Sequence, residues 1–101
     1  MSDRLTNDAI TAFLEASPHW GYEGEALHRS LKFKNFSEAL AFLVRIGIEA
    51  EKRDHHPELR NVYATVDVAL TTHDAGGVTS KDVDLAGAID AIAVAMGARD
   101  V

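Results

Sequence analysis

Apolar residues recur at helical spacing near the start of the chain, where they predict a helix over residues 7–16. Its apolar face consists of Ile10, Phe13 and Leu14. Thr6 precedes the helix, where its hydroxyl can cap an exposed backbone N–H group. Ser17-Pro18 is expected to end the helix, because the residue before a proline avoids the helical conformation.

The clearest helical pattern follows Asn35 and runs to about Lys52. Asn35 and Glu38 have the spacing of a capping box, which satisfies free backbone donors at a helix start. The apolar stripe of this helix consists of Leu40, Leu43, Val44, Gly47 and Ile48, and it is widened by Phe36, Ala39, Phe42 and Ile46. So broad a stripe predicts that the helix covers more than one partner surface.

Two segments have strand-like patterns. Residues 20–33 predict a hairpin with its turn around Gly24, although the helical propensity of residues 23–31 argues against it. Residues 61–73 alternate with a period of two, and no turn residue interrupts them, so they predict one long strand or a strand pair. One face of this segment holds Val62, Ala64, Val66, Val68 and Leu70, and the other holds Tyr63, Thr65, Asp67 and Ala69.

A last helix is predicted after "DAGG", where Thr79 and Asp82 form a second capping box. Its predicted buried face consists of Val83, Ala86, Ile89, Ala93 and Met96. Gly97 and the terminal "ARDV" are expected to fray. The element order α-β-β-α-β-β-α predicts an α+β fold, a two-layer sandwich in which three helices pack on one face of a four-stranded antiparallel sheet.

Composition narrows the classes of function. The 101 residues suit a single domain spanning 1–101, and the net charge of −6 without a basic block argues against direct binding of nucleic acid or anionic membranes. The absence of cysteine excludes disulfides, thiolate catalysis and thiolate metal sites. No apolar run is long enough to span a membrane and the N-terminus lacks a secretory signal pattern, so a cytoplasmic location is expected.

Two adjacent histidines, His55 and His56, stand before Pro57 where the long helix is expected to end. Imidazole changes charge near neutral pH and is the commonest general acid or base, and Asp54 and Glu58 can orient such a ring. Alternatively, cationic histidines complement the dipole at a solvated helix end, and this stretch alone slightly favours that interpretation.

His73 ends the most apolar strand pattern, beside Asp74 and before Gly76-Gly77. Loops on a rigid scaffold carry functional side chains, so His73 is a candidate site residue, in even balance with a polar residue that merely ends a strand. Zinc binding is disfavoured because the histidines lack the spacing that places two ligands on one face. No serine has the context of a nucleophile elbow. Residues assigned to the surface or to packing are His19 and His28, and those assigned to the core are Trp20, Phe33, Phe36 and Phe42.

The segment "AEKRDHHPELRNVYATVDVALTTHDAGGVTSKDVDLA" resembles the pterin-4a-carbinolamine dehydratase family. The matching motifs are Glu51-Lys52, Asp54-His55-His56-Pro57, Asn61-Val62-Tyr63, Thr72-His73, Gly76-Gly77 and Asp82. Upstream, "ALHRSLKFKNFSEALAFLVRIGIEAEK" is similar to the family's hairpin strand and long helix, so the resemblance covers most of the chain after Trp20. The chain departs from the family at Leu59, where an aromatic residue is usual, and at Leu31, where phenylalanine is frequent.

The resemblance implies a hydro-lyase that dehydrates 4a-hydroxytetrahydropterin to quinonoid dihydropterin with neither a metal nor an organic cofactor. By the same resemblance, His55 and His73 are the expected general acid/base pair, His56 binds and orients the pterin, and Asp82 holds a histidine in its working tautomer. The expected contacts to the polar edge of the ring are Asp54, Thr72 and Asp74.

The resemblance also implies partners. Family members form homodimers or homotetramers through sheet edges and the long helix, and they recycle the tetrahydrobiopterin cofactor of aromatic amino acid hydroxylases. The alternative is a non-catalytic interaction module of the same fold, since some relatives act as dimerisation cofactors of a transcription factor. The joint presence of the histidines, Asp82 and the glycine loop favours the enzyme.

Overall fold

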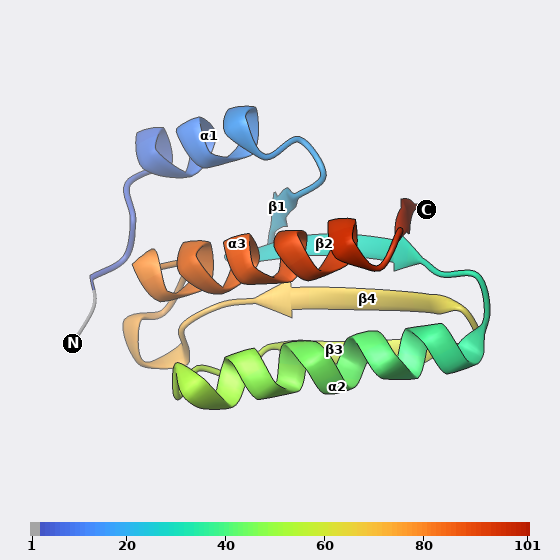
Figure 1. Ribbon diagram of the computed structural model, residues 1–101. Coiled ribbons are helices and arrows are strands. Elements are labelled where there is room, and N and C mark those ends of the chain that lie inside the picture. Colours follow the sequence, from blue (N-terminus) through green and yellow to red (C-terminus); the bar gives the residue numbers. More distant parts are fainter. Residues whose placement is uncertain (1–2) are drawn as a thin grey trace.

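The computed structural model describes residues 3–101 and confirms the α+β fold (Figure 1). The elements in order are α1 (Asn7–Ala16), β1 (Gly21–Glu23), β2 (Ala26–Lys32), α2 (Phe36–Lys52), β3 (Glu58–Val62), β4 (Thr65–Leu70), the 3₁₀ helix η1 (His73–Ala75), α3 (Ser80–Ala95) and β5 (Arg99–Asp100). The predicted caps of the three α-helices are confirmed, because the side chains of Thr6, Asn35 and Thr79 each accept a backbone N–H group.

The antiparallel sheet has the strand order β1-β2-β4-β3, and the short β5 also pairs with β2. The first predicted hairpin is confirmed. Its two-residue turn consists of Gly24 and Glu25, both with positive φ (60° and 62°), as tight hairpin turns require. The fraying expected after Gly97 is wrong, because Gly97 adopts a left-handed conformation (φ 69°) that returns the chain to the sheet edge at β5.

The predicted alternating segment is a strand pair and not one strand. Tyr63 takes a left-handed conformation (φ 50°), and the chain reverses so that Val62 pairs with Thr65. The Asn61 amide donates to the carbonyl oxygens of Tyr63 and Thr65 at 3.0 and 2.9 Å, which holds the turn without a glycine. The turn was missed because side-chain hydrogen bonds supply what a Gly-containing dipeptide usually supplies.

The buried face of α2 differs from the predicted stripe. Its buried residues are Ala39, Phe42, Ile46 and Ala50. Most of the stripe and its Phe36 flank are exposed: Phe36 51%, Leu40 43%, Val44 63% and Ile48 52%. The expectation that Phe36 belongs to the core is therefore wrong. The helix is apolar on two faces, and only one of them contacts the sheet and α3.

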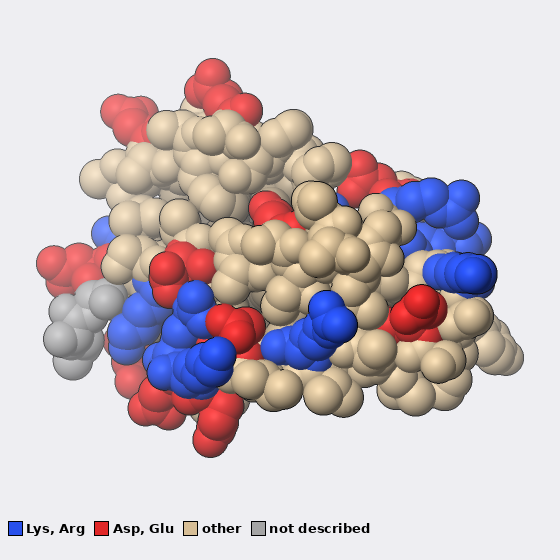
Figure 2. Space-filling view, in the orientation of Figure 1, with Lys and Arg blue, Asp and Glu red and all other residues tan. Residues whose placement is uncertain are grey.

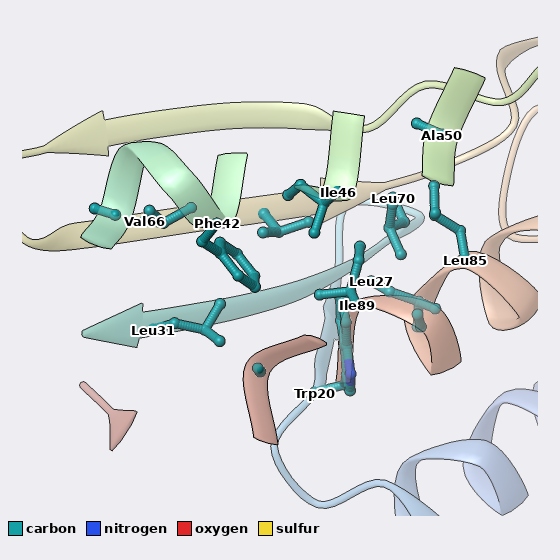
Figure 3. Packing of buried hydrophobic residues seen from close by; sticks show 14 of the residues in the cluster. Trp20, Leu27, Leu31, Phe42, Ile46, Ala50, Val66, Leu70, Leu85 and Ile89 are labelled. Atoms are coloured by element: carbon teal, nitrogen blue, oxygen red, sulfur yellow. The ribbon is translucent and has the colours of Figure 1, made fainter. Parts of the chain in front are cut away.

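The core lies between the inner face of the sheet and helices α2 and α3 (Figure 3). Inward-facing Leu27 and Leu31 of β2 meet Phe42 and Ile46 of α2, with Ile89 of α3 beside them. On α3 the buried row includes Leu85, whereas the predicted Val83 and Met96 are only half-buried. The core thus fixes α2 and α3 side by side on one sheet face.

Candidate active site

One end of the molecule gathers the predicted site segments. The end of α2, the start of α3 and the loop after β4 lie together there, on the left in Figure 1. The β3–β4 hairpin causes this, because the segment before β3 and the segment after β4 emerge from the same end of an antiparallel pair. His55 and His73 are thereby brought together from two separate motifs.

The end of α2 aims His55 at this region. Asp54 has a positive φ of 49°, and the amides of Asp54 and His55 donate to the carbonyls of Glu51 and Ala50. This is the Schellman arrangement, in which a left-handed residue ends a helix. Aspartate tolerates that conformation better than most residues, so Asp54 has a structural role besides any contact with a ligand.

His55 and Asp82 form the buried part of the site. His55 Nε2 lies 2.6 Å from Asp82 Oδ1, and the exposed fractions of the two side chains are 11% and 0%. The other carboxylate oxygen, Oδ2, accepts from the Thr72 hydroxyl at 2.8 Å and from the Thr79 amide at 2.9 Å. Asp82 therefore has two roles: its carboxylate completes the capping box of α3, and it also orients the His55 ring.

This network determines where its protons lie when Asp82 is ionised. A carboxylate only accepts, so Thr72 must use its single hydrogen on Asp82, and the bond between the Thr72 and Thr79 hydroxyls (2.8 Å) must be donated by Thr79. By the same reasoning His55 carries a hydrogen on Nε2. The nitrogen left to exchange a proton is Nδ1.

A cleft of about 260 Å³ joins these groups to the remaining predicted residues. Its lining consists of Asp54, His55, His56, Thr71, Thr72, His73, Asp74 and Lys81. His73, on η1, is exposed, and His56 is 60% exposed with its Nε2 bonded to Glu51 at 2.9 Å. Apart from the buried Asp82, each predicted site residue lines this one cleft.

Charged side chains surround the cleft, and Figure 2 shows acidic and basic groups intermingled at this end of the molecule. Arg53 connects the two helices, because it donates to Asp84 of α3 at 2.7 Å and to Glu49 of α2 at 2.9 Å. These hydrogen bonds, to Asp84 and then Glu49, raise the pKa of the Arg53 guanidinium. Its bond to Glu49, followed by that of Lys52, lowers the pKa of the Glu49 carboxyl.

Some site residues escaped the sequence reasoning. Thr71 and Lys81 line the cleft, and the hydroxyl of Thr79 accepts the Lys81 amide at 3.2 Å while supporting Thr72. Thr71 follows a strand pattern and Lys81 a helix cap, so neither has a local signal of function. Leu59, on the edge strand β3, is not among the cleft residues.

His19 and His28 lie outside the cleft. His19 contacts Asp100 at 2.8 Å, and the His28 ring bonds the Glu23 carbonyl. Among residues 3–101, no three His, Asp or Glu side chains gather as metal ligands. Over the same range, none of the helices combines the length and apolar character needed to cross a bilayer.

The geometry supports proton transfer. The site combines an imidazole fixed in one tautomer by a buried carboxylate, a second imidazole in the lining of the same small cleft, and two exposed carboxylates in that lining. Groups of this kind serve as general acid and base toward a small polar ligand.

Comparison with known proteins supports this kind of chemistry. Residues 3–92 match the family model described as pterin 4 alpha carbinolamine dehydratase. A protein of Rhodopseudomonas palustris (strain BisB18), provisionally named pterin-4-alpha-carbinolamine dehydratase, is 54% identical over 98% of this chain and its own full length. A Bradyrhizobium protein (strain BTAi1) with the same provisional name is 54% identical over 95% of this chain and 99% of its own.

Solved structures share the fold. A crystal structure described as a transcriptional coactivator/pterin dehydratase of Brucella melitensis is 44% identical, with a TM-score of 0.87 over 90% of this chain and 99% of that one. A pterin dehydratase-like protein described as a RuBisCO assembly factor of the alpha-carboxysome has a TM-score of 0.61 at 19% identity, over 73% of this chain and 86% of its own. The second likeness concerns the fold alone.

Proposed function

The chain belongs to the pterin 4-alpha-carbinolamine dehydratase family, and we propose that its histidine cleft dehydrates a 4a-hydroxytetrahydropterin to quinonoid dihydropterin and water. The observation that carries the proposal is the His55–Asp82 bond in the wall of the cleft that also contains His73.

The reaction needs two proton transfers. The bond from ring carbon C4a to the hydroxyl oxygen breaks, and its electron pair leaves with the oxygen, which is protonated so that water departs. The adjacent ring nitrogen N5 loses its proton, and its electrons form the new double bond to C4a. Groups that titrate near neutral pH serve both steps, and neither step requires a metal or an organic cofactor.

The surroundings of each residue support the roles that we propose. His55 and His73 are the acid/base pair, because Asp82 fixes the His55 tautomer and His73 lines the same cleft. His56, oriented by Glu51, binds the pterin ring. Asp54 and Asp74 accept from the amino and N–H groups at the polar edge of the ring. Thr72 has its hydroxyl hydrogen engaged with Asp82, so its contact with the ring is through its remaining atoms.

The test is stopped-flow decay of freshly generated 4a-hydroxytetrahydropterin. The wild-type protein is expected to accelerate the decay over buffer, equally with and without a metal chelator. A folded protein that gives no acceleration contradicts the proposal and supports the interaction-module alternative, to which the coactivator description of the Brucella relative also points. We expect the protein to act in the cytoplasm, where this step would recycle the tetrahydrobiopterin that an aromatic amino acid hydroxylase has used.

The exposed apolar row of α2 suits self-association. Leu40, Val44 and Ile48 are spaced four residues apart on one face, and apolar surface of this kind marks interaction sites. We propose that this row joins copies of the chain into a homodimer or homotetramer.

Val44→Asp is expected to weaken self-association by about tenfold or more, because it places a charge in the centre of the contact. Light scattering coupled to size-exclusion chromatography measures the change. Val94→Asp is the control, since Val94 is 82% exposed on α3. Oligomers of equal mass for wild type and Val44→Asp would exclude this row as the interface.

A further inference from the structure

A second and larger hollow adjoins the histidine cleft. It has a volume of about 580 Å³ and shares Thr71 and His73 with the cleft, so the two spaces meet at His73. We call it the side cavity; its other residues come from the β1–β2 turn, the neighbouring strands and the glycine pair after η1. They are Glu23, Gly24, Glu25, Ala26, His28, Glu58, Ala69, Gly76 and Gly77.

The register of the sheet shapes the side cavity. Ala69 of β4 pairs with His28 of β2 on one side and with Glu58 of β3 on the other. Directly paired residues share a face of the sheet, so a small alanine stands in one row between two larger side chains. Val68 and Leu70 are buried in the core, which places Ala69 on the face away from the helices. The low point of the cavity is therefore Ala69.

The turn that borders the side cavity is fixed to the site. The Thr71 hydroxyl donates to the Glu25 carbonyl at 2.9 Å, which ties the β1–β2 turn to the strand end that leads into His73. Arg4 adds a contact to Glu25 at 3.7 Å. The cavity is thus built before any ligand arrives, and its position relative to His73 is set.

The side cavity is acidic. Three of its residues are glutamates, Glu23, Glu25 and Glu58. Arg4 lies beside the lining and contacts Glu25, so the negative charge of the cavity comes mainly from Glu23 and Glu58. Carboxylates accept hydrogen bonds from hydroxyl groups and repel other anions. A neutral, hydroxylated group suits this surface, and a carboxylated or phosphorylated group does not.

Substrate chemistry connects the two spaces. In a 4a-hydroxytetrahydropterin, the carbon that carries the side chain, C6, is bonded to N5, the nitrogen that loses its proton. A ring held between His55 and His73 for reaction at C4a and N5 therefore places its C6 substituent beside a catalytic histidine. His73 forms the boundary with the side cavity, so the cavity is the nearest built space for that substituent.

We propose that the side cavity binds the C6 side chain of the pterin and selects a neutral, hydroxylated side chain over an anionic one, with Glu58 and Ala69 as specificity-determining residues. The inference rests on the proposed dehydratase function. Glu58 supplies the acceptor and the charge, and Ala69 supplies the room.

The experiment compares three carbinolamines, with 6-methyl, 6-(1,2-dihydroxypropyl) and 6-carboxy substituents, in stopped-flow dehydration by the wild-type protein. The readout is the ratio of KM values between substituents, with the 6-methyl compound as reference. One additional hydrogen bond predicts a KM about three- to tenfold lower for the dihydroxypropyl compound than for the methyl compound. The carboxylate is expected to raise KM by a similar factor.

Two variants separate room from charge. Ala69→Leu fills the cavity. It is expected to abolish the preference for the dihydroxypropyl compound, so that its KM becomes about equal to that of the methyl compound. Glu58→Gln keeps the shape, and it is expected to reduce the discrimination against the carboxylate by about threefold or more. Glu15→Gln, a surface glutamate of α1, is the control and should keep the wild-type ratios.

The outcomes distinguish the two levels of the proposal. If no carbinolamine is dehydrated, the proposed function itself fails. If all three are dehydrated with equal KM values, or if Ala69→Leu and Glu58→Gln keep the wild-type ratios, the dehydratase function stands and the side-cavity inference is overturned. Binding of the stable 7,8-dihydropterins with the same substituents, measured by calorimetry, gives the same ratios without turnover.

Discussion

His55→Ala is expected to lower kcat for carbinolamine dehydration by about 10²–10⁴-fold while leaving the fold intact. The imidazole is replaced at a position where the backbone already adopts an ordinary helix exit, because Asp54 and not His55 takes the left-handed conformation. The lost function is proton transfer at a fixed nitrogen, which water in the vacated space replaces poorly. KM is expected to change less than kcat, because His55 acts on the transition state more than on the bound ground state.

Stopped-flow kinetics of wild type, His55→Ala and His73→Ala measure this effect, and far-ultraviolet circular dichroism confirms folding. His19→Ala is the matched control. His19 is an exposed histidine that contacts Asp100 and does not line the cleft. If folded His55→Ala retains the wild-type kcat, the acid/base assignment is wrong even if the protein is a dehydratase.

Asp82→Asn is expected to lower kcat by about 10²–10⁴-fold and to change its pH dependence. The amide has one acceptor oxygen, whereas the carboxylate accepts from His55, Thr72 and Thr79. If the amide oxygen keeps the Thr72 and Thr79 donors, its NH₂ group faces His55 Nε2. That nitrogen must then accept, and the hydrogen of neutral His55 moves to Nδ1, the wrong position for a base.

The change also acts on stability. Loss of a charge-assisted bond at a fully buried group is expected to cost about 1.5–3 kcal/mol in the free energy of unfolding, measured with urea. The ¹⁵N shifts of the His55 ring report the tautomer directly. Asp84→Asn, which neutralises an exposed carboxylate of the same helix, controls for the change in charge. A wild-type tautomer together with a low kcat would show that Asp82 acts other than by orienting His55.

The sequence predicted the fold where local signals agreed. The caps at Thr6, Asn35 and Thr79, the hairpin at Gly24 and the end of α1 all rest on residues whose side chains determine the local backbone. The faces of α2 could not be predicted, because both are apolar and periodicity alone does not say which meets the sheet. Only the three-dimensional arrangement separates buried Ile46 from exposed Ile48.

Arg29 illustrates the other limit. It stands in the inward-facing row of β2 with Leu27 and Leu31, and it is 7% exposed. Its charge is met by Asp90 of α3, whose carboxylate also accepts the Trp20 indole N–H at 2.9 Å. A partner 61 positions away leaves no trace in a local pattern.

The resemblance predicted the members of the site and a contact between Asp82 and a histidine, but not the hydroxyl groups that support Asp82. The motifs named His55, His73 and Asp82. In the structure His55 and His73 line one cleft, and the buried Asp82 bonds His55 behind it. The hydroxyl relay from Thr79 through Thr72 to Asp82 could not be predicted, because threonines at a strand end and a helix cap are common for structural reasons alone. The roles of these residues toward substrate stay predictions.

The turn at Tyr63 and Ala64 lies far from the site, but it sets the register between β3 and β4. The two histidine segments leave the same end of β3 and β4, so their mutual position depends on how many residues the far turn contains. One residue inserted there would offset the strands by about 3.4 Å and reverse the face of every side chain beyond it. A register shift that begins at this tip, about 20 Å from the cleft along six residues of strand, would therefore displace His55 relative to His73.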